Sequence, residues 1–244
     1  MSELTIVSFN AHAGLHPRRE GVCAPYDLVP VLRGFDDADV IVLQESFAPD
    51  EEPAAVQKVA AELGAELHEL VIGRVKLDPW PQLLDASPLT TGTTGIAVLS
   101  RLPSTRIAKL AVGKVWSDPA HERGALHVAL DVDGTTVDLV AVHLTSRLPH
   151  GPPIQMARLR RLLPPADRPA VVVGDHNFWG PGVVACLPGW RRAVRGRTWP
   201  ASRPHSQIDH ILVRGNTNVL SGEVLPDVGS DHLPVRARLR FTDA

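Results

Sequence analysis

The chain has 244 residues, of which 44% are hydrophobic and 21% are charged, and its formal net charge is -2. This composition is typical of a folded globular protein and argues against a disordered chain, and the small net charge gives no strong overall attraction to nucleic acid. Two cysteines are too few for a disulfide framework or a Cys-rich zinc site, and no apolar run approaches the roughly 18 residues of a membrane span.

Short runs rich in Val, Ile and Leu dominate the chain and predict buried strands. In chain order they cover residues 4–9, 40–43, 95–99, 137–142, 170–173 and 208–213. Two further segments, residues 126–133 and 235–241, alternate apolar and polar side chains and predict strands with one solvated face. Asp133-Gly134 lies between two strand runs and predicts a hairpin turn.

Helical signals are fewer than strand signals. An acidic run before Pro53 and an apolar stripe that ends at Gly64 predict one helix, and residues 26–35 and 154–163 predict two more. Long loops are expected at residues 78–94 and 195–207. Many strands with few helices predict two packed sheets with helices outside, and we expect one domain over residues 1–244 because no shift in composition marks a boundary. The N-terminus lacks a signal-peptide pattern, so we expect a cytoplasmic protein.

Polar residues stand just past the ends of four predicted strands. Asn10, Glu45, His143 and Asp175 each follow an apolar run directly, and Asn177 comes two residues after Asp175. These are the positions at which side chains gather at one rim of a sheet when strands run in the same direction.

Two later strands carry polar groups near their starts instead. Asp209 comes before one apolar run, and Asp231-His232 precedes the alternating strand at the C-terminus. An antiparallel strand begins at the rim where its neighbour ends. We therefore expect these groups to meet the first five at a common edge.

The residue types suit phosphoryl transfer. Asn10, Glu45 and Asp231 offer hard oxygen ligands of the kind that Mg²⁺ prefers. Asp and His side chains can position and deprotonate a water molecule, and amide or imidazolium donors can stabilise the charge that grows on a phosphate. Each residue also has an ordinary structural explanation: Asn10 could end a turn, and His143 could be a hydrogen-bonded core histidine. Their combined placement favours catalysis.

Seven short motifs, in this order, resemble the endonuclease/exonuclease/phosphatase superfamily, which includes pancreatic-type deoxyribonucleases, AP endonucleases, neutral sphingomyelinases and inositol polyphosphate 5-phosphatases. They extend from Thr5 to Arg238 and comprise Ser8-Phe9-Asn10, Leu43-Gln44-Glu45, residues 95–101, Val142-His143-Leu144, Gly174-Asp175-His176-Asn177, residues 207–212 and residues 230–234. The resemblance implies a DNase I-like α/β fold, a four-layer sandwich of two mixed β-sheets flanked by helices.

The resemblance also implies a metal site and a phosphate-binding site. Asn10 and Glu45 would hold Mg²⁺ or Mn²⁺, with Glu45 the most direct ligand, and Asp231 would complete the set. His143 would donate to a phosphate oxygen. The segment Glu122-Arg123-Gly124-Ala125 resembles one that places an arginine near the phosphate, so Arg123 is a candidate substrate-binding residue.

The implied catalytic residues are a carboxylate and a histidine with their supports. Asp175 would orient or deprotonate the attacking water, with Asn177 beside it. His232 would contact the scissile phosphate as base or as cation, and Asp209 would orient its ring. Trp179 follows Asn177 closely, and from its position alone it is a candidate wall of the substrate pocket.

Two positions depart from the family pattern. The motif usually written Gly-Asp-Phe-Asn has His176 in the third place, and we expect that ring to point away from Asp175 and Asn177 because neighbouring side chains alternate in an extended segment. His12 stands where many AP endonuclease relatives carry an aspartate near the metal. The roles of His12 and His176 and the number of metals therefore stay open.

The leading hypothesis is a metal-dependent hydrolase that cleaves a phosphodiester, in nucleic acid or a small molecule, by in-line attack of water. The alternative is a phosphomonoesterase acting on a small-molecule or lipid-derived phosphate. A calcineurin-like two-metal enzyme would need a late Gly-x-His segment that the chain lacks, and a binding module without turnover would have lost a ligand or the water-activating group. We expect no obligate protein partner.

Overall fold

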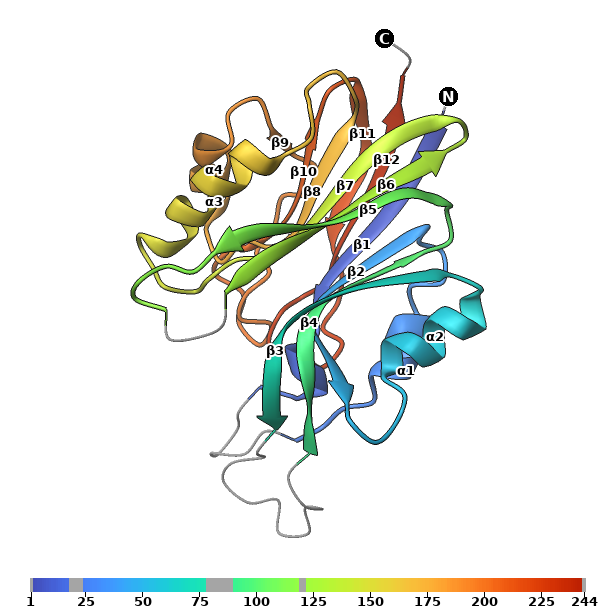
Figure 1. The fold of residues 1–244 in the computed structure, drawn as a ribbon, viewed down its shortest axis with the longest axis vertical. Coiled ribbons are helices and arrows are strands. Elements are labelled where there is room, and N and C mark those ends of the chain that lie inside the picture. The colour runs from blue at the N-terminus through green and yellow to red at the C-terminus, as the bar shows by residue number, and fades with distance from the viewer. Residues whose placement is uncertain (1, 18–23, 78–89, 119–121, 243–244) are drawn as a thin grey trace.

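The structure is a computed structural model that describes residues 2–17, 24–77, 90–118 and 122–242. Twelve strands form two six-stranded mixed sheets in this part of the chain, and helices lie on the outer faces (Figure 1). This arrangement is the predicted four-layer sandwich. None of the described helices has the length and apolar character that a membrane crossing requires.

The first sheet has the strand order β11-β12-β1-β2-β4-β3. Its strands are β1 (Ser2–Asn10), β2 (Val40–Pro49), β3 (Glu66–Leu77), β4 (Thr90–Ser100), β11 (Thr217–Val224) and β12 (Val235–Phe241). Helices α1 (Leu28–Arg33) and α2 (Ala55–Leu63) cover its outer face, and a short 3-10 helix, η1 (His12–Gly14), follows β1.

The second sheet has the order β5-β6-β7-β8-β10-β9. It contains β5 (Ser104–Gly113), β6 (Arg123–Val132), β7 (Thr135–His143), β8 (Ala170–Asp175), β9 (Arg191–Arg192) and β10 (Asp209–Arg214). Helices α3 (Gly151–Leu162) and α4 (Gly180–Cys186) pack on its outer face through a separate apolar cluster.

Burial on both faces explains the continuous apolar runs. In β1, Leu4 and Ile6 point into the core between the sheets, while Val7 and Phe9 point into the cluster beneath α1 and α2. A strand in the middle of such a sandwich has no solvated face, so its sequence shows no apolar–polar alternation.

The structure corrects several predicted elements. The strand predicted over residues 126–133 has no fully solvated second face, because His127 is buried with Asp138. The predicted loop at residues 78–94 lies outside the described residues as far as residue 89, and β4 already begins at Thr90. The sequence does not predict strands β3, β5, β9 and β11, the 3-10 helix η1 or helix α4. The three predicted helices are present, with shorter or shifted ends.

Candidate active site

Strand register brings the predicted polar residues to one rim of the sandwich. In the first sheet β1 and β2 are parallel, and Asn10 is level with Gln44. In the second sheet His143 at the end of β7 is level with Asp175 at the end of β8, and Asp209 at the start of the antiparallel β10 is also level with Asp175. The strand ends therefore meet at this rim, as the sequence predicts.

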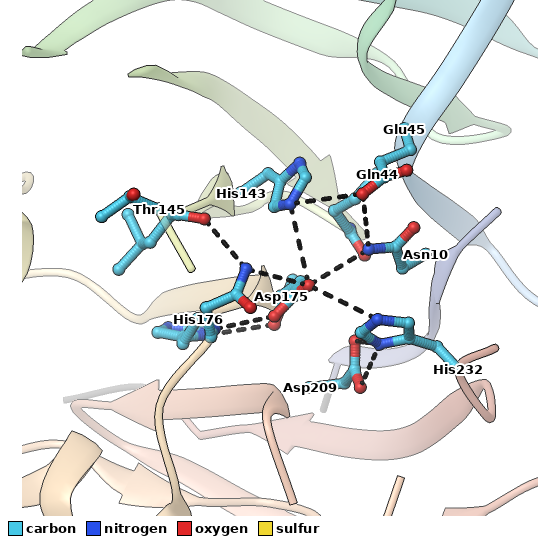
Figure 2. Close-up of polar contacts among 12 residues, drawn as sticks. Asn10, Gln44, Glu45, His143, Thr145, Asp175, His176, Asp209 and His232 are labelled. Carbon is cyan, nitrogen blue, oxygen red and sulfur yellow. Dashed lines mark hydrogen bonds and ion pairs between the residues drawn. The ribbon is translucent and has the colours of Figure 1, made fainter. Parts of the chain in front are cut away.

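Asp175 is the centre of this cluster and is almost completely buried (Figure 2). Its Oδ2 accepts hydrogen bonds from Asn10 Nδ2 at 3.1 Å and from Asn177 Nδ2 at 3.2 Å, and its Oδ1 accepts one from the Asn177 backbone N–H at 2.7 Å. The Nε2 atoms of His143 and His232 lie 3.7 and 3.8 Å from Asp175 Oδ2. The bond from Asn10 joins the two sheets at the site.

The glycine before Asp175 is required by close packing. Gly174 has a φ of 134°, and a Cβ atom at this position would come within 2.1 Å of the Val142 carbonyl oxygen. Only glycine allows β8 to approach β7 this closely while it turns the next carboxylate toward the rim.

His232 is held by a carboxylate from another strand. Its Nδ1 lies 2.9 and 3.1 Å from the two carboxylate oxygens of Asp209, and the Ser230 hydroxyl accepts a hydrogen bond from the His232 backbone N–H while donating to the Asn10 carbonyl. Burial alone would lower the pKa of His232, but the charge and hydrogen bond of Asp209, followed by the charge of Asp175, raise it to about 10. His232 is therefore an imidazolium at neutral pH.

The surroundings of Asp175 disfavour its charged form, whereas those of His232 favour its charged form. Burial and the charge of Asp209 raise the pKa of Asp175 to about 7, although the charge of His232 and the hydrogen bonds from Asn177 and Asn10 act in the other direction. A carboxylate with a pKa near neutrality is suited to accept a proton from water.

His143 is a neutral donor. Burial, and then the charges of Arg123 and His232, hold its pKa well below the ordinary value. Arg123 Nη1 lies 3.3 Å from His143 Nδ1, and because a guanidinium can only donate, that ring nitrogen must accept. The proton then lies on His143 Nε2, which is 3.7 Å from Glu45 Oε1.

Glu45 reaches the rim through an irregular backbone. The pairing of β2 with β4 shifts register between Leu43 and Ser46, and Glu45 has a φ of 50°. His12 and Asn177 also have positive φ, at 46° and 49°. Positive φ is uncommon for residues other than glycine and costs of order 1–3 kcal/mol, and such strain gathers at functional sites.

Two groups of side chains could hold a metal ion. Asp175, Asp209 and His232 each offer one ligand atom, and these atoms lie within 4.8 Å of one another. Both oxygens of Asp209, however, already face His232 Nδ1.

The predicted set supplies only oxygen donors. Glu45 Oε1 lies 3.5 Å from Asn10 Nδ2, and Asn10 Oδ1 accepts from the His12 backbone N–H. Asp231 Oδ2 accepts from the Trp199 indole N–H at 3.2 Å. This donor chemistry fits a hard divalent cation.

Most of these side chains surround a hollow of about 460 Å³. We call it the aromatic hollow, because its wall includes the aromatic residues Phe178, Trp179 and Trp199. Leu148 also lines it. Trp179 and Arg123, both predicted to contact substrate, line it. Its polar lining also includes His12, Glu45, His143, Asp175, Asn177, Asp231 and His232, whereas Asn10 and Asp209 are not among its lining residues.

A second hollow of about 260 Å³ meets the first. It shares Glu45, Arg123 and His143 with the aromatic hollow, and its further lining includes Ile72, Val75, Leu77, Thr94 and Gly95. We call it the aliphatic hollow. The three shared residues mark the junction between the two.

Sequence reasoning missed Trp199 and left two histidines open. The sequence predicts no site residue in the loop that carries Trp199, yet Trp199 lines the aromatic hollow and its indole N–H donates to Asp231. His12 also lines that hollow, and its Nδ1 donates to the Leu15 carbonyl. His176 is fully buried, bonds the Gly174 carbonyl and packs edge-on against His210, so it does not face the hollow.

Comparison with family models identifies this architecture. The model described as the Endonuclease/Exonuclease/phosphatase family matches residues 7–232, and the chain belongs to this family. The fold and the buried Asp/His cluster are those of a phosphoester hydrolase with a possible metal site. A search of curated proteins finds no significant match.

Solved structures agree on the fold. An endonuclease/exonuclease/phosphatase from Beutenbergia cavernae is 22% identical, with a TM-score of 0.72 over 99% of this chain and 72% of that one. The mannosyl-6-phosphatase Bt3783 of Bacteroides thetaiotaomicron is 16% identical, with a TM-score of 0.69 over 98% and 100% of the two chains. The catalytic domain of human Nocturnin, solved with a bound sulfate anion, is 18% identical, with a TM-score of 0.72 over 98% and 95%.

Proposed function

We propose that the chain is a divalent-metal-dependent phosphodiesterase in which Asp175 activates a water molecule for in-line attack on phosphorus. One observation carries the proposal: a buried carboxylate with a pKa near 7 lies within 4 Å of the ring nitrogens of a charged and a neutral histidine at the edge of an open hollow. A base can activate the attacking water, and a cation and a neutral donor can stabilise the charge that grows on a phosphate.

The chain's own residues divide the chemistry as follows. Asp175 takes a proton from water as the new oxygen–phosphorus bond forms and the bond to the leaving oxygen breaks. Asn10 and Asn177 fix the orientation of the Asp175 carboxylate. His232, oriented by Asp209, stabilises negative charge on a phosphate oxygen, and it does so as a cation at neutral pH.

His143 and Arg123 complete the phosphate site. His143 donates from Nε2 to another phosphate oxygen, and Arg123 fixes the ring of His143 through Nδ1. Both residues line the two hollows at their junction, where a phosphate in contact with His143 would also meet Glu45.

Mg²⁺ or Mn²⁺ would be held by Glu45 with Asn10 and Asp231. A bound divalent ion would neutralise charge on the phosphate and orient one of its oxygens. We favour this oxygen-donor set over Asp175, Asp209 and His232, because Asp209 already uses both oxygens to hold His232.

The two hollows favour a diester over a monoester. A phosphate at the junction has space on both sides, and a diester carries a substituent on each side whereas a monoester carries only one. A phosphomonoesterase for a small or lipid-derived phosphate is the alternative, and the name of the Bacteroides thetaiotaomicron protein indicates that the same fold serves a sugar phosphatase.

The test compares bis(p-nitrophenyl) phosphate with p-nitrophenyl phosphate in the presence of Mn²⁺. We expect the diester to be hydrolysed with the higher kcat/KM, EDTA to abolish the rate, and Mg²⁺ or Mn²⁺ to restore it. Faster release of inorganic phosphate from monoesters would select the alternative. Full activity in EDTA would refute the role of the metal.

A further inference from the structure

The aliphatic side chains that line the aliphatic hollow have no part in the bond-breaking step proposed above. Ile72, Val75 and Leu77 all come from β3 and line the hollow beside the junction residues. A bulge explains how they share it: β3 pairs with β4 through Val71 and Gly73, and Ile72 between them is the extra residue. A bulge shifts the alternation of side chains by one position.

The apolar surface continues beyond this hollow. A third hollow of about 420 Å³ shares Ala13 and Leu77 with the aliphatic hollow, and its lining includes Leu15, Tyr26 and Phe47. An aliphatic chain that enters at the junction could therefore extend past Leu77 and meet further apolar side chains.

The charges around the phosphate site argue against a nucleic-acid strand. Among the described residues that line the aromatic and aliphatic hollows, Arg123 is the only Lys or Arg, whereas Glu45, Asp175 and Asp231 contribute carboxylates. A nucleic acid carries a further phosphate on each side of the bond that is cut, and proteins neutralise those phosphates with Lys and Arg. The one guanidinium at the junction already donates to His143, so the described residues of these linings offer no Lys or Arg side chain for a neighbouring phosphate.

We infer that the substrate is a small phosphodiester with one uncharged aliphatic arm, and that this arm lies along Ile72, Val75 and Leu77. The phosphate lies at the junction, and the second arm lies against the aromatic wall. This inference rests on the proposed function and narrows it to one substrate class.

The experiment uses p-nitrophenyl alkyl phosphates with methyl, butyl and hexyl arms and follows release of p-nitrophenol. Complete burial of one methylene corresponds to about 0.8 kcal/mol, about fourfold in kcat/KM. In a hollow open to solvent we expect about twofold per methylene, which is about thirtyfold from methyl to hexyl.

Two variants and one control locate the arm. Ile72→Ser and Val75→Ser should each reduce the hexyl-over-methyl ratio severalfold, because the rate on the hexyl ester falls much further than the rate on the methyl ester. Urea unfolding of each variant shows whether the fold is intact. Two variants are used because Ile72 also packs against the core between the sheets. Val71→Ser is the matched control, because Val71 is a neighbouring aliphatic residue on the same strand, is 55% exposed and does not line the aliphatic hollow. It should keep the full ratio.

Three results would overturn the inference. The first is a rate that does not depend on arm length, and the second is an equal reduction of the ratio in Val71→Ser and Val75→Ser. The third is cleavage of plasmid DNA with a higher kcat/KM than the hexyl ester. Failure to hydrolyse any ester, including bis(p-nitrophenyl) phosphate, would instead refute the proposed function on which the inference rests.

Discussion

Among the residues that the structure describes, two buried aspartates at opposite ends of the second sheet, Asp209 and Asp138, lie within hydrogen-bond distance of a buried histidine ring. At the candidate active site His232 Nδ1 lies 2.9 Å from Asp209 Oδ2, and at the other end His127 Nε2 lies 2.7 Å from Asp138 Oδ1. Asp138 is level with Ala170 at the start of β8, whereas Asp209 is level with Asp175 at its end. Five residues of strand, roughly 16 Å, separate these two levels.

The surroundings of the two pairs differ more than the pairs themselves. The free ring nitrogen of His232 lies 3.8 Å from Asp175 and 3.9 Å from Asp231, and the ring lines an open hollow. The Asp138 carboxylate lies 3.1 Å from Arg168 Nη2, and neither member of that pair lines the aromatic or the aliphatic hollow. A buried His–Asp pair therefore does not by itself indicate a catalytic site. Further carboxylates around the same ring, next to an open hollow, give that indication.

The largest expected effect separates the two histidines. His232→Asn and His127→Gln each retain an amide N–H near the nitrogen that faces the aspartate, so both preserve a neutral hydrogen bond. We expect His232→Asn to reduce kcat/KM on bis(p-nitrophenyl) phosphate by about 10³-fold or more, because the imidazolium at the phosphate is lost. His127→Gln should stay within about twofold of the wild type. Comparable losses of activity in both variants would show that the two His–Asp pairs do not differ in their contribution to catalysis.

A smaller effect, on stability, should appear at the opposite end of the sheet. Asp138→Ala removes the partner of a buried histidine and of Arg168. We expect it to lower the free energy of unfolding by about 3 kcal/mol. This value is the lower end of the range for breaking a buried pair, because Arg168 is partly exposed. Urea unfolding measures this change. The control is Asp133→Asn in the exposed hairpin turn, where asparagine suits the positive φ, with an expected change below about 0.5 kcal/mol. Equal stability of both variants would show that the Asp138 pair contributes nothing.

The smallest effect concerns two buried histidines that have no carboxylate between them. Burial lowers the pKa of His176 to about 4, and burial and then the charge of His176 lower the pKa of His210 to about 3. At pH 8 both rings are neutral in the folded and the unfolded chain. Below that pH the unfolded chain takes up protons that the folded protein excludes, so the free energy of unfolding falls as the pH falls toward these values.

His176→Phe removes one of these two contributions. Between pH 8 and pH 5 the stability lost by the variant should be about 2 kcal/mol less than the loss by the wild type, since one group contributes about 1.4 kcal/mol per pH unit below its unfolded pKa. Urea unfolding at both pH values measures the difference. The same pH dependence in both proteins would mean that His176 takes up its proton in the folded state.

The sequence predicts most of the site because most of the site lies at strand ends. Asn10, His143 and Asp175 follow apolar runs. The parallel register of β7 and β8 brings His143 level with Asp175, and Asn10 reaches Asp175 from the end of β1 in the other sheet. The family and the DNase I-like fold are confirmed, while the roles of the individual site residues stay predictions.

Features that depend on tertiary structure could not be predicted in this way. The loop that carries Trp199 is fixed by long-range bonds, among them Ala201 N–H to the Asp231 carbonyl and Leu233 N–H to the Thr198 carbonyl. No sequence pattern indicates the course of this loop. The bulge at Ile72, which lets its side chain share a hollow with others of β3, depends equally on the partner strand.

The most direct measurement is the activity and stability of Asp175→Asn. Because burial and then the charge of Asp209 raise the pKa of Asp175 to about 7, the free energy of unfolding falls as the pH rises from the ordinary pKa of an aspartate toward 7, and this loss is complete at pH 8. At pH 8 we therefore expect kcat/KM on bis(p-nitrophenyl) phosphate to fall by about 10³-fold or more, while the free energy of unfolding is unchanged or higher. A variant that retains the wild-type rate, or one that loses as much stability as Asp138→Ala, would contradict the assignment of Asp175 as the base at the centre of the site.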